Sequence, residues 1–140
     1  MRRTSRGTAA VELALVVPCL VLLLGLMIAG GRVWFARETV EEAASTAARS
    51  ASLARTGPEA VKEGGLAGRH VLRTGGFGCA DQSVRVDAGA FAVPVGQPAT
   101  VTTRVACTVT FGDLLLPGMP GQMTITAVGS SALDTYRERR

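Results

Sequence analysis

The hydrophobic pattern of the chain begins with a long uncharged run near its N-terminus. The 19 residues from Leu13 to Gly31 carry no charge and are dominated by Leu, Val, Ala and Gly. At about 1.5 Å rise per residue a helix of this length spans about 28 Å, which is close to the hydrocarbon thickness of a bilayer. A buried helix of a small soluble domain is seldom so long and so uniformly apolar. The run therefore predicts a membrane-spanning helix.

Beyond the uncharged run the pattern stays helical but becomes amphipathic. Apolar residues recur at helical spacing over residues 33–54, and polar residues take the opposite face. The pair Gly57-Pro58 ends the pattern. We therefore expect one helix from Thr8 to Arg55, with residues 8–31 in the membrane and residues 32–58 continuing outside it.

The C-terminal part of the chain has a different period. Residues 59–73 predict a second, weaker helix that glycines interrupt, and after it the period changes to two. Alternating apolar and polar residues predict strands at 84–87, 100–111 and 123–128. One apolar face on each strand suits an antiparallel sheet covered by the long helix. The predicted fold class is α+β, in which the long N-terminal membrane-spanning helix continues into a small antiparallel β-sheet domain at residues 59–140.

Charge adds an orientation to this picture. Arg2, Arg3 and Arg6 precede the apolar run with no acidic residue before Glu12, which favours an N-terminus in the cytoplasm and a C-terminal domain outside. The net charge of +4 does not indicate nucleic-acid binding, because 12 basic and 11 acidic residues remain once residues 1–7 are set aside. No basic stripe with interleaved aromatics remains either.

Glu12 is unexpected at the start of an apolar helix. A carboxylate at the centre of a membrane helix costs about 2.5–3.5 kcal/mol, and less near the interface. Glu12 therefore either marks the interfacial end of the helix or has a partner. A cut after Gly7 would provide a partner, since the α-amino group of Thr8 would lie one helical turn from the Glu12 carboxylate. Paired charges cost far less in hydrocarbon than a lone charge.

The two cysteines of the C-terminal part, Cys79 and Cys107, lie in the domain predicted outside the cytoplasm, where disulfides persist. We expect a structural disulfide between them. The alternative is a redox or metal-binding pair, but the chain has no Cys-x-x-Cys motif and the pair has no third ligand. Cys19 lies in the membrane segment and is expected to act there as a small apolar residue.

Motifs for catalysis are missing from the sequence. We find no nucleophile elbow, no phosphate-binding loop and no zinc-protease helix, and His70 is the one histidine of the chain. The chain is therefore not expected to be an enzyme, to bind a metal or cofactor, or to act on a small-molecule substrate. The linker at residues 112–122 contains Leu and Met residues that either form a contact site or cap the core.

The string Arg6-Gly7-Thr8-Ala9-Ala10-Val11-Glu12-Leu13-Ala14-Leu15-Val16-Val17-Pro18 resembles the start of TadE-like proteins. These are minor pilins, or pseudopilins, of tight-adherence (Flp) type IV pilus systems. A short basic leader ending in Gly, with Glu at the fifth position after it, is similar to the class III signal peptide of type IV pilins.

The resemblance implies roles for single residues. Residues 1–7 would be the leader peptide, and the prepilin peptidase would cut between Gly7 and Thr8. Glu12 would be needed to align subunits during pilus assembly. Pro18 sits where it would kink or loosen the helix.

The resemblance also implies a function and a place in the cell. The chain would be a minor pilin, because the major pilin of these systems is typically much smaller. It would lie in the inner membrane as a single-pass protein and enter, or prime, an extracellular pilus. Its partners would be other pilin subunits, the assembly machinery, the prepilin peptidase and membrane lipid, with no nucleic acid among them.

Two other classes of protein stay open. In a secreted soluble protein, the small residues Ala29-Gly30-Gly31 would serve an ordinary signal peptidase. Glu12 and the helical pattern that continues past Gly31 speak against that class. In a plain single-span membrane protein of unrelated role, Gly7 and Glu12 would be coincidental.

Overall fold

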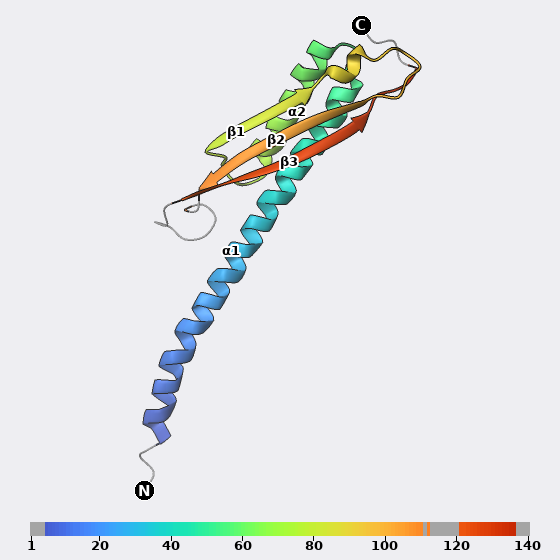
Figure 1. Ribbon diagram of the computed structural model, residues 1–140. Coiled ribbons are helices and arrows are strands. Elements are labelled where there is room, and N and C mark those ends of the chain that lie inside the picture. Colours follow the sequence, from blue (N-terminus) through green and yellow to red (C-terminus); the bar gives the residue numbers. More distant parts are fainter. Residues whose placement is uncertain (1–4, 111, 113–120, 137–140) are drawn as a thin grey trace.

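The computed structural model describes residues 5–110, 112 and 121–136, and of residues 5–10 the backbone alone. Within these residues, the two α-helices are α1 (Ser5–Leu53) and α2 (Gly57–Thr74), and a short 3-10 helix is η1 (Gly89–Ala92). The strands are β1 (Asp81–Asp87), β2 (Thr100–Thr110) and β3 (Gln122–Ala132). They form one sheet in the order β1-β2-β3, and both helices pack against the same face of it (Figure 1). The predicted α+β fold is confirmed.

The helix α1 is the longest element of the molecule. It has 49 residues and at about 1.5 Å per residue extends about 73 Å. Its N-terminal half projects away from the domain, while its C-terminal half lies along the sheet (Figure 1). The prediction of one continuous helix is confirmed, although it begins at Ser5 and ends at Leu53 instead of running from Thr8 to Arg55.

A short capped turn separates the two helices. Thr56 has an extended backbone, and its Oγ1 accepts a hydrogen bond from the Glu59 backbone N–H at 3.2 Å. The Glu59 carboxylate in turn accepts the backbone N–H of Arg55 at 3.0 Å. Pro58 stands in the first turn of α2, where its missing N–H needs no partner. These contacts end one helix and start the next, and α2 returns antiparallel along α1.

The predicted interruption of α2 by glycines is wrong, because α2 is continuous over 18 residues. A Cβ on Gly64 would lie 2.9 Å from the Ala47 carbonyl oxygen and 3.0 Å from the Ala51 Cβ. A Cβ on Gly68 would lie 3.2 Å from the Ala47 Cβ. Glycine in a helix interior costs about 1 kcal/mol relative to alanine. Here that cost is offset by the close approach of α2 to α1.

The sheet is antiparallel throughout and has one apolar face. β2 is the central strand, with Val105 opposite Val84 on β1 and opposite Ala127 on β3. Alternate residues of β2 are buried, while the residues between them form the outer face. The three predicted strands are confirmed, and β1 and β3 are longer than predicted.

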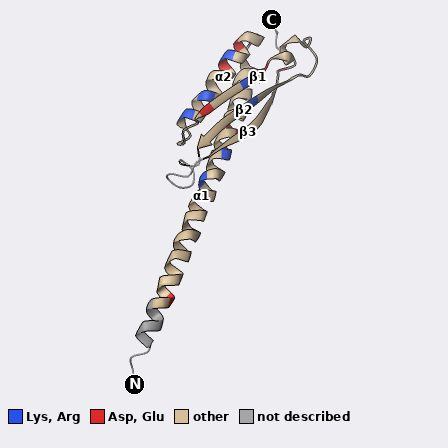
Figure 2. Cartoon of the chain, turned by 60° about the vertical axis from the view of Figure 1, so that its left-hand side comes forward, with Lys and Arg blue, Asp and Glu red and all other residues tan. Residues whose placement is uncertain are grey.

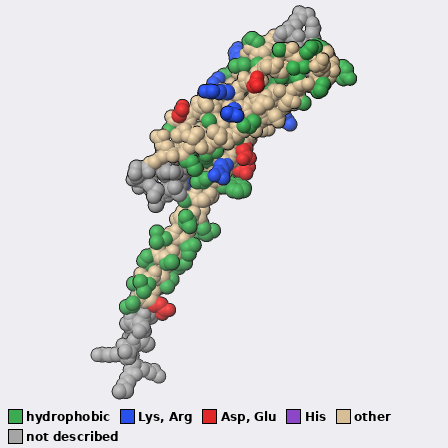
Figure 3. All heavy atoms as spheres, viewed as in Figure 1, with side chains coloured by type: hydrophobic (Ala, Val, Ile, Leu, Met, Phe, Trp, Pro, Cys, Tyr) green, Lys and Arg blue, Asp and Glu red, His purple; other side chains and the backbone are tan. Residues whose placement is uncertain are grey.

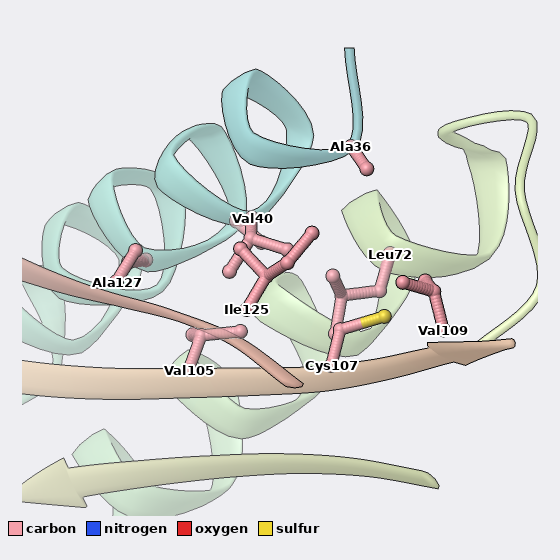
Figure 4. Packing of buried hydrophobic residues seen from close by; sticks show 10 residues of the cluster. Ala36, Val40, Leu72, Val105, Cys107, Val109, Ile125 and Ala127 are labelled. Atoms are coloured by element: carbon pink, nitrogen blue, oxygen red, sulfur yellow. The ribbon is translucent and has the colours of Figure 1, made fainter. Parts of the chain in front are cut away.

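The core is built almost entirely from small aliphatic side chains. On α1 an alanine stripe that includes Ala36, Ala44 and Ala51 is fully buried, together with Val40. Figure 4 shows residues from α1, α2, β2 and β3 meeting in this layer. The labelled residues are Ala36, Val40, Leu72, Val105, Cys107, Val109, Ile125 and Ala127. Because an alanine Cβ is short, the helix axis can lie close to the sheet.

The helix and the sheet approach each other closely at Ala44. The buried Thr103 Oγ1 donates a hydrogen bond to the Ala44 carbonyl oxygen at 2.7 Å. On the neighbouring strand, a Cβ on Gly129 would overlap the same carbonyl group. The Ala44 carbonyl thus faces the sheet directly. The Thr103 hydroxyl donates a hydrogen bond to it, and Gly129, which has no side chain, leaves room for it.

A disulfide joins Cys79 to Cys107. Cys107 lies in the buried face of β2, and Cys79 lies in the segment between α2 and β1. The neighbouring backbone N–H of Ala80 donates to the Thr108 carbonyl at 2.7 Å. The bridge and this hydrogen bond together fix the end of the α2–β1 connection to the central strand.

Substituting Gly129→Ala should destabilise the domain by about 1–3 kcal/mol, because the new methyl group overlaps backbone atoms of Ala44 that cannot easily move. The free energy of unfolding can be measured in mild detergent with urea. Gly78→Ala is the matched control, since nothing lies within 4 Å of its added Cβ, and it should change stability by less than about 0.5 kcal/mol. Equal stability of the two variants would contradict the packing described here.

Removing the disulfide with Cys79→Ala and Cys107→Ala should cost about 3–4 kcal/mol, since the bridge spans 28 residues of sequence and restricts the unfolded chain. The same urea titration measures it, with and without a reducing agent. Cys19→Ala, at the free cysteine, is the control and should leave the stability of the domain unchanged. A double variant as stable as the oxidised protein would show that the bridge does not stabilise the fold.

Candidate functional site

The part of α1 that projects from the domain, residues 11–31, is called the stem here. Its large apolar side chains from Val11 to Ile28 are between 46% and 74% exposed. Hydrophobic side chains cover the stem in Figure 3. Five consecutive residues, from Leu20 to Leu24, are all exposed, so the apolar surface runs around the whole helix and not along one stripe. Such a surface needs lipid or other helices around it instead of water.

The stem has the dimensions of a bilayer core. Within the described residues, one helix is long and apolar enough to cross a membrane, judged by length and composition. From Glu12 to Arg32 the helix rises about 30 Å at about 1.5 Å per residue, and the hydrocarbon core of a bilayer is also about 30 Å thick. An α-helix satisfies its own backbone hydrogen bonds, as hydrocarbon requires.

Glu12 is the one charged residue among residues 11–31. Its side chain is exposed, one helical turn after Thr8 and next to the N-terminal end of the stem. Figure 2 shows that the charged residues gather on the domain, whereas the stem is almost entirely uncharged. The backbone of Gly7 and Thr8 lies within α1. If a chain began at Thr8, helical geometry would therefore set its amino group on the same face as the Glu12 carboxylate.

Pro18 lies inside α1, which continues as a helix on both sides of it. Proline has no backbone N–H, so the Ala14 carbonyl loses its usual partner four residues on. This is a local weak point in an apolar helix, and the predicted kink there stays a prediction. Cys19, next to it, is a free and exposed thiol.

His70 is exposed on α2, and among the described residues His, Cys, Asp and Glu do not form a group of three or more that could hold a metal ion. The contact site considered for the linker at residues 112–122 falls mainly on residues 113–120, which lie outside the described residues.

Two exposed aromatic residues were not predicted as functional. Trp34 is 65% exposed and Phe35 is 71% exposed, and both lie within four residues of Gly31, where the uncharged run ends. Tryptophan just beyond an apolar run is typical of a membrane–water interface. That signal is present in the sequence and could have indicated Trp34.

Comparison with known proteins gives a family match for the N-terminal helix. No curated protein and no solved structure matches the chain significantly. The resemblance of the N-terminal motif is confirmed by a family model: residues 7–49, which make up most of α1 and include the whole stem, match the TadE-like protein family.

Proposed function

We propose that this chain is a minor pilin, or pseudopilin, that is held in the inner membrane by the stem and is incorporated into, or primes, a Tad/Flp-type pilus. One observation carries the proposal. The segment that matches the TadE-like family is the helix whose exposed apolar half has the length of a bilayer core. The role is structural, and the chain itself performs no reaction.

The proposed topology has the N-terminus in the cytoplasm and the domain outside. Arg2, Arg3 and Arg6 precede the stem, and basic residues favour the cytoplasmic side. The disulfide between Cys79 and Cys107 supports the same orientation, because disulfides persist in oxidising compartments.

Processing would prepare the helix for assembly. The prepilin peptidase would remove residues 1–7 and with them three positive charges that hold the N-terminus at the cytoplasmic surface. The new α-amino group of Thr8 would then lie one turn from Glu12. This leaves one positive and one negative charge at the end of an otherwise uncharged stem.

These two charges would direct subunit docking. Between neighbouring helices in an apolar environment, the amine of one chain and the Glu12 carboxylate of another form an ion pair. Each charge would be costly in this environment without its partner. The apolar surface around the whole stem lets it exchange lipid for neighbouring helices without contacting water. The other partners in this account are the assembly machinery and the other pilins of the system.

Glu12→Gln tests the assembly role. The variant should stay in the membrane and be cut like the wild type, because the apolar run and the cut site are unchanged. Its incorporation into sheared pili, or its cross-linking to other pilins, should fall at least about tenfold. Breaking a buried ion pair costs about 3–5 kcal/mol, whereas a tenfold loss needs only about 1.4 kcal/mol.

Glu38→Gln is the matched control, since it removes the same charge from an exposed site on the same helix beyond the stem. It should assemble normally. If Glu12→Gln assembled as well as Glu38→Gln, the carboxylate would have no part in docking.

A further inference from the structure

Directly after the uncharged run, α1 carries two pairs of an arginine and an aromatic residue. Arg32 and Phe35 are three positions apart, as are Trp34 and Arg37, so each pair shares one side of the helix. At 100° per residue the two pairs point to different sides. The four side chains thus lie on two sides of the helix, while Ala36 between them is buried against the domain. Residues 32–37 are called the collar here.

Each pair borders a hollow in the surface. The first hollow has a volume of about 550 Å³, and the second has about 420 Å³. The first is lined by Arg32, Phe35, Thr39, Gly75, Gly76, Phe77, Gly78 and Gly112. The second is lined by Leu26, Ala29, Gly30, Val33, Trp34 and Arg37. The first hollow thus sets one guanidinium group beside two phenylalanine rings and glycine backbone, and the second sets one guanidinium group among mainly apolar side chains.

The folded domain begins at the level of the collar. Ala36 and Val40 are fully buried in the core, so no spacer separates the domain from the stem. Gly75, at the end of α2, packs against the Thr39 side chain, and Phe77 lines the first hollow beside the collar. The end of the domain nearest the stem therefore lies beside residues 32–39 (Figure 1).

The dimensions of the collar fit the headgroup layer of a bilayer. From Arg32 to Arg37 the helix rises about 7.5 Å. A bilayer of about 40–45 Å with a hydrocarbon core of about 30 Å leaves about 5–7.5 Å of headgroup region on each side. When the stem fills the hydrocarbon core, the collar occupies this layer.

We infer that the collar binds phospholipid headgroups of the outer leaflet, while the stem residues that line the second hollow, Leu26, Ala29 and Gly30, contact the acyl chains below them. The Trp34 ring lies at the boundary between headgroups and acyl chains, and the guanidinium groups of Arg32 and Arg37 face lipid phosphates. This contact determines the depth of the helix in the bilayer and holds the domain at the membrane surface. The inference rests on the membrane anchoring proposed above but not on pilus assembly.

Lipid fits this surface better than a single protein partner does. A protein partner would cover one side of the helix, whereas the arginine–aromatic pairs occur on different sides. A lipid layer contacts, at one level, every side of the helix that the domain leaves exposed. The collar also continues the apolar stem directly, and its width matches the headgroup layer.

Trp34 is the single tryptophan of the chain and can report its own depth. The full-length protein is reconstituted into phosphatidylcholine–phosphatidylglycerol vesicles that contain phosphatidylcholine brominated near the head or near the end of its acyl chain. Trp34 fluorescence should be quenched about twofold more by the shallow bromines than by the deep ones, as for an interfacial tryptophan. Iodide in the buffer should quench it only weakly.

A variant with Trp34→Phe and Tyr136→Trp moves the tryptophan to a site that is 90% exposed beyond the last strand. Iodide should quench this control strongly, and the brominated lipids should have no effect on it. The control shows that quenching by lipid depends on the collar position and not on the vesicles in general.

The outcomes separate this inference from the proposed anchoring. Flotation of the vesicles on a density gradient first shows whether the protein is membrane-bound. If the protein floats but its Trp34 is quenched by iodide and by no brominated lipid, the collar does not bind headgroups, while the membrane anchoring still holds. Quenching strongest from the deep bromines, or by neither probe, would overturn the collar as well. A protein that does not float would overturn both.

Discussion

One continuous helix has to satisfy two different surroundings, and the rest of the molecule follows from that constraint. Along the stem, α1 presents large apolar side chains in every direction, which suits a surrounding of lipid or other helices. Along its second half the same helix presents mainly alanine to a sheet. Because no break occurs between the two halves, the position of the stem determines where the domain lies.

The alanine stripe determines how the domain is built. Side chains this short leave the helix backbone close to the sheet. At the contact the sheet must therefore supply a hydrogen-bond donor for the helix carbonyl and a residue without a side chain. Thr103 supplies the hydroxyl that bonds the Ala44 carbonyl, and Gly129 supplies the absence of a side chain. The same requirement appears between the helices, where Gly64 and Gly68 face Ala47. With few large side chains in the core, the disulfide is expected to carry a substantial part of the stability.

The long helix and the strands could be predicted because their signals are local. Nineteen uncharged residues indicate a membrane helix from composition and length alone, and the alternation in residues 100–110 indicates a strand with one buried face. The ends of the elements were less predictable. Thr56 and Glu59 together end α1 earlier than the pair Gly57-Pro58 suggested, because their side chains bond the backbone of the turn.

The glycines of α2 were misjudged for a tertiary reason. In sequence they are helix-weakening residues, and their value becomes visible only when α1 lies against them. The disulfide between Cys79 and Cys107 was expected because both cysteines lie in the domain predicted outside the cytoplasm, where disulfides persist. The hollows beside Arg32 and Arg37 could not be predicted, since the first of them joins α1 to residues more than 35 positions away. Glu12 and the cut after Gly7 rest on the motif and on helical geometry.

We propose that the stem is the processed helix of a pilin-like subunit. The decisive experiment is to determine the N-terminus of the membrane-extracted protein, made in its native host with the prepilin peptidase present. We expect a chain that begins at Thr8. A chain beginning near Arg32 would indicate a secreted protein released by an ordinary signal peptidase, and an intact Met1 would indicate a plain single-span anchor. Either of these results would contradict the account.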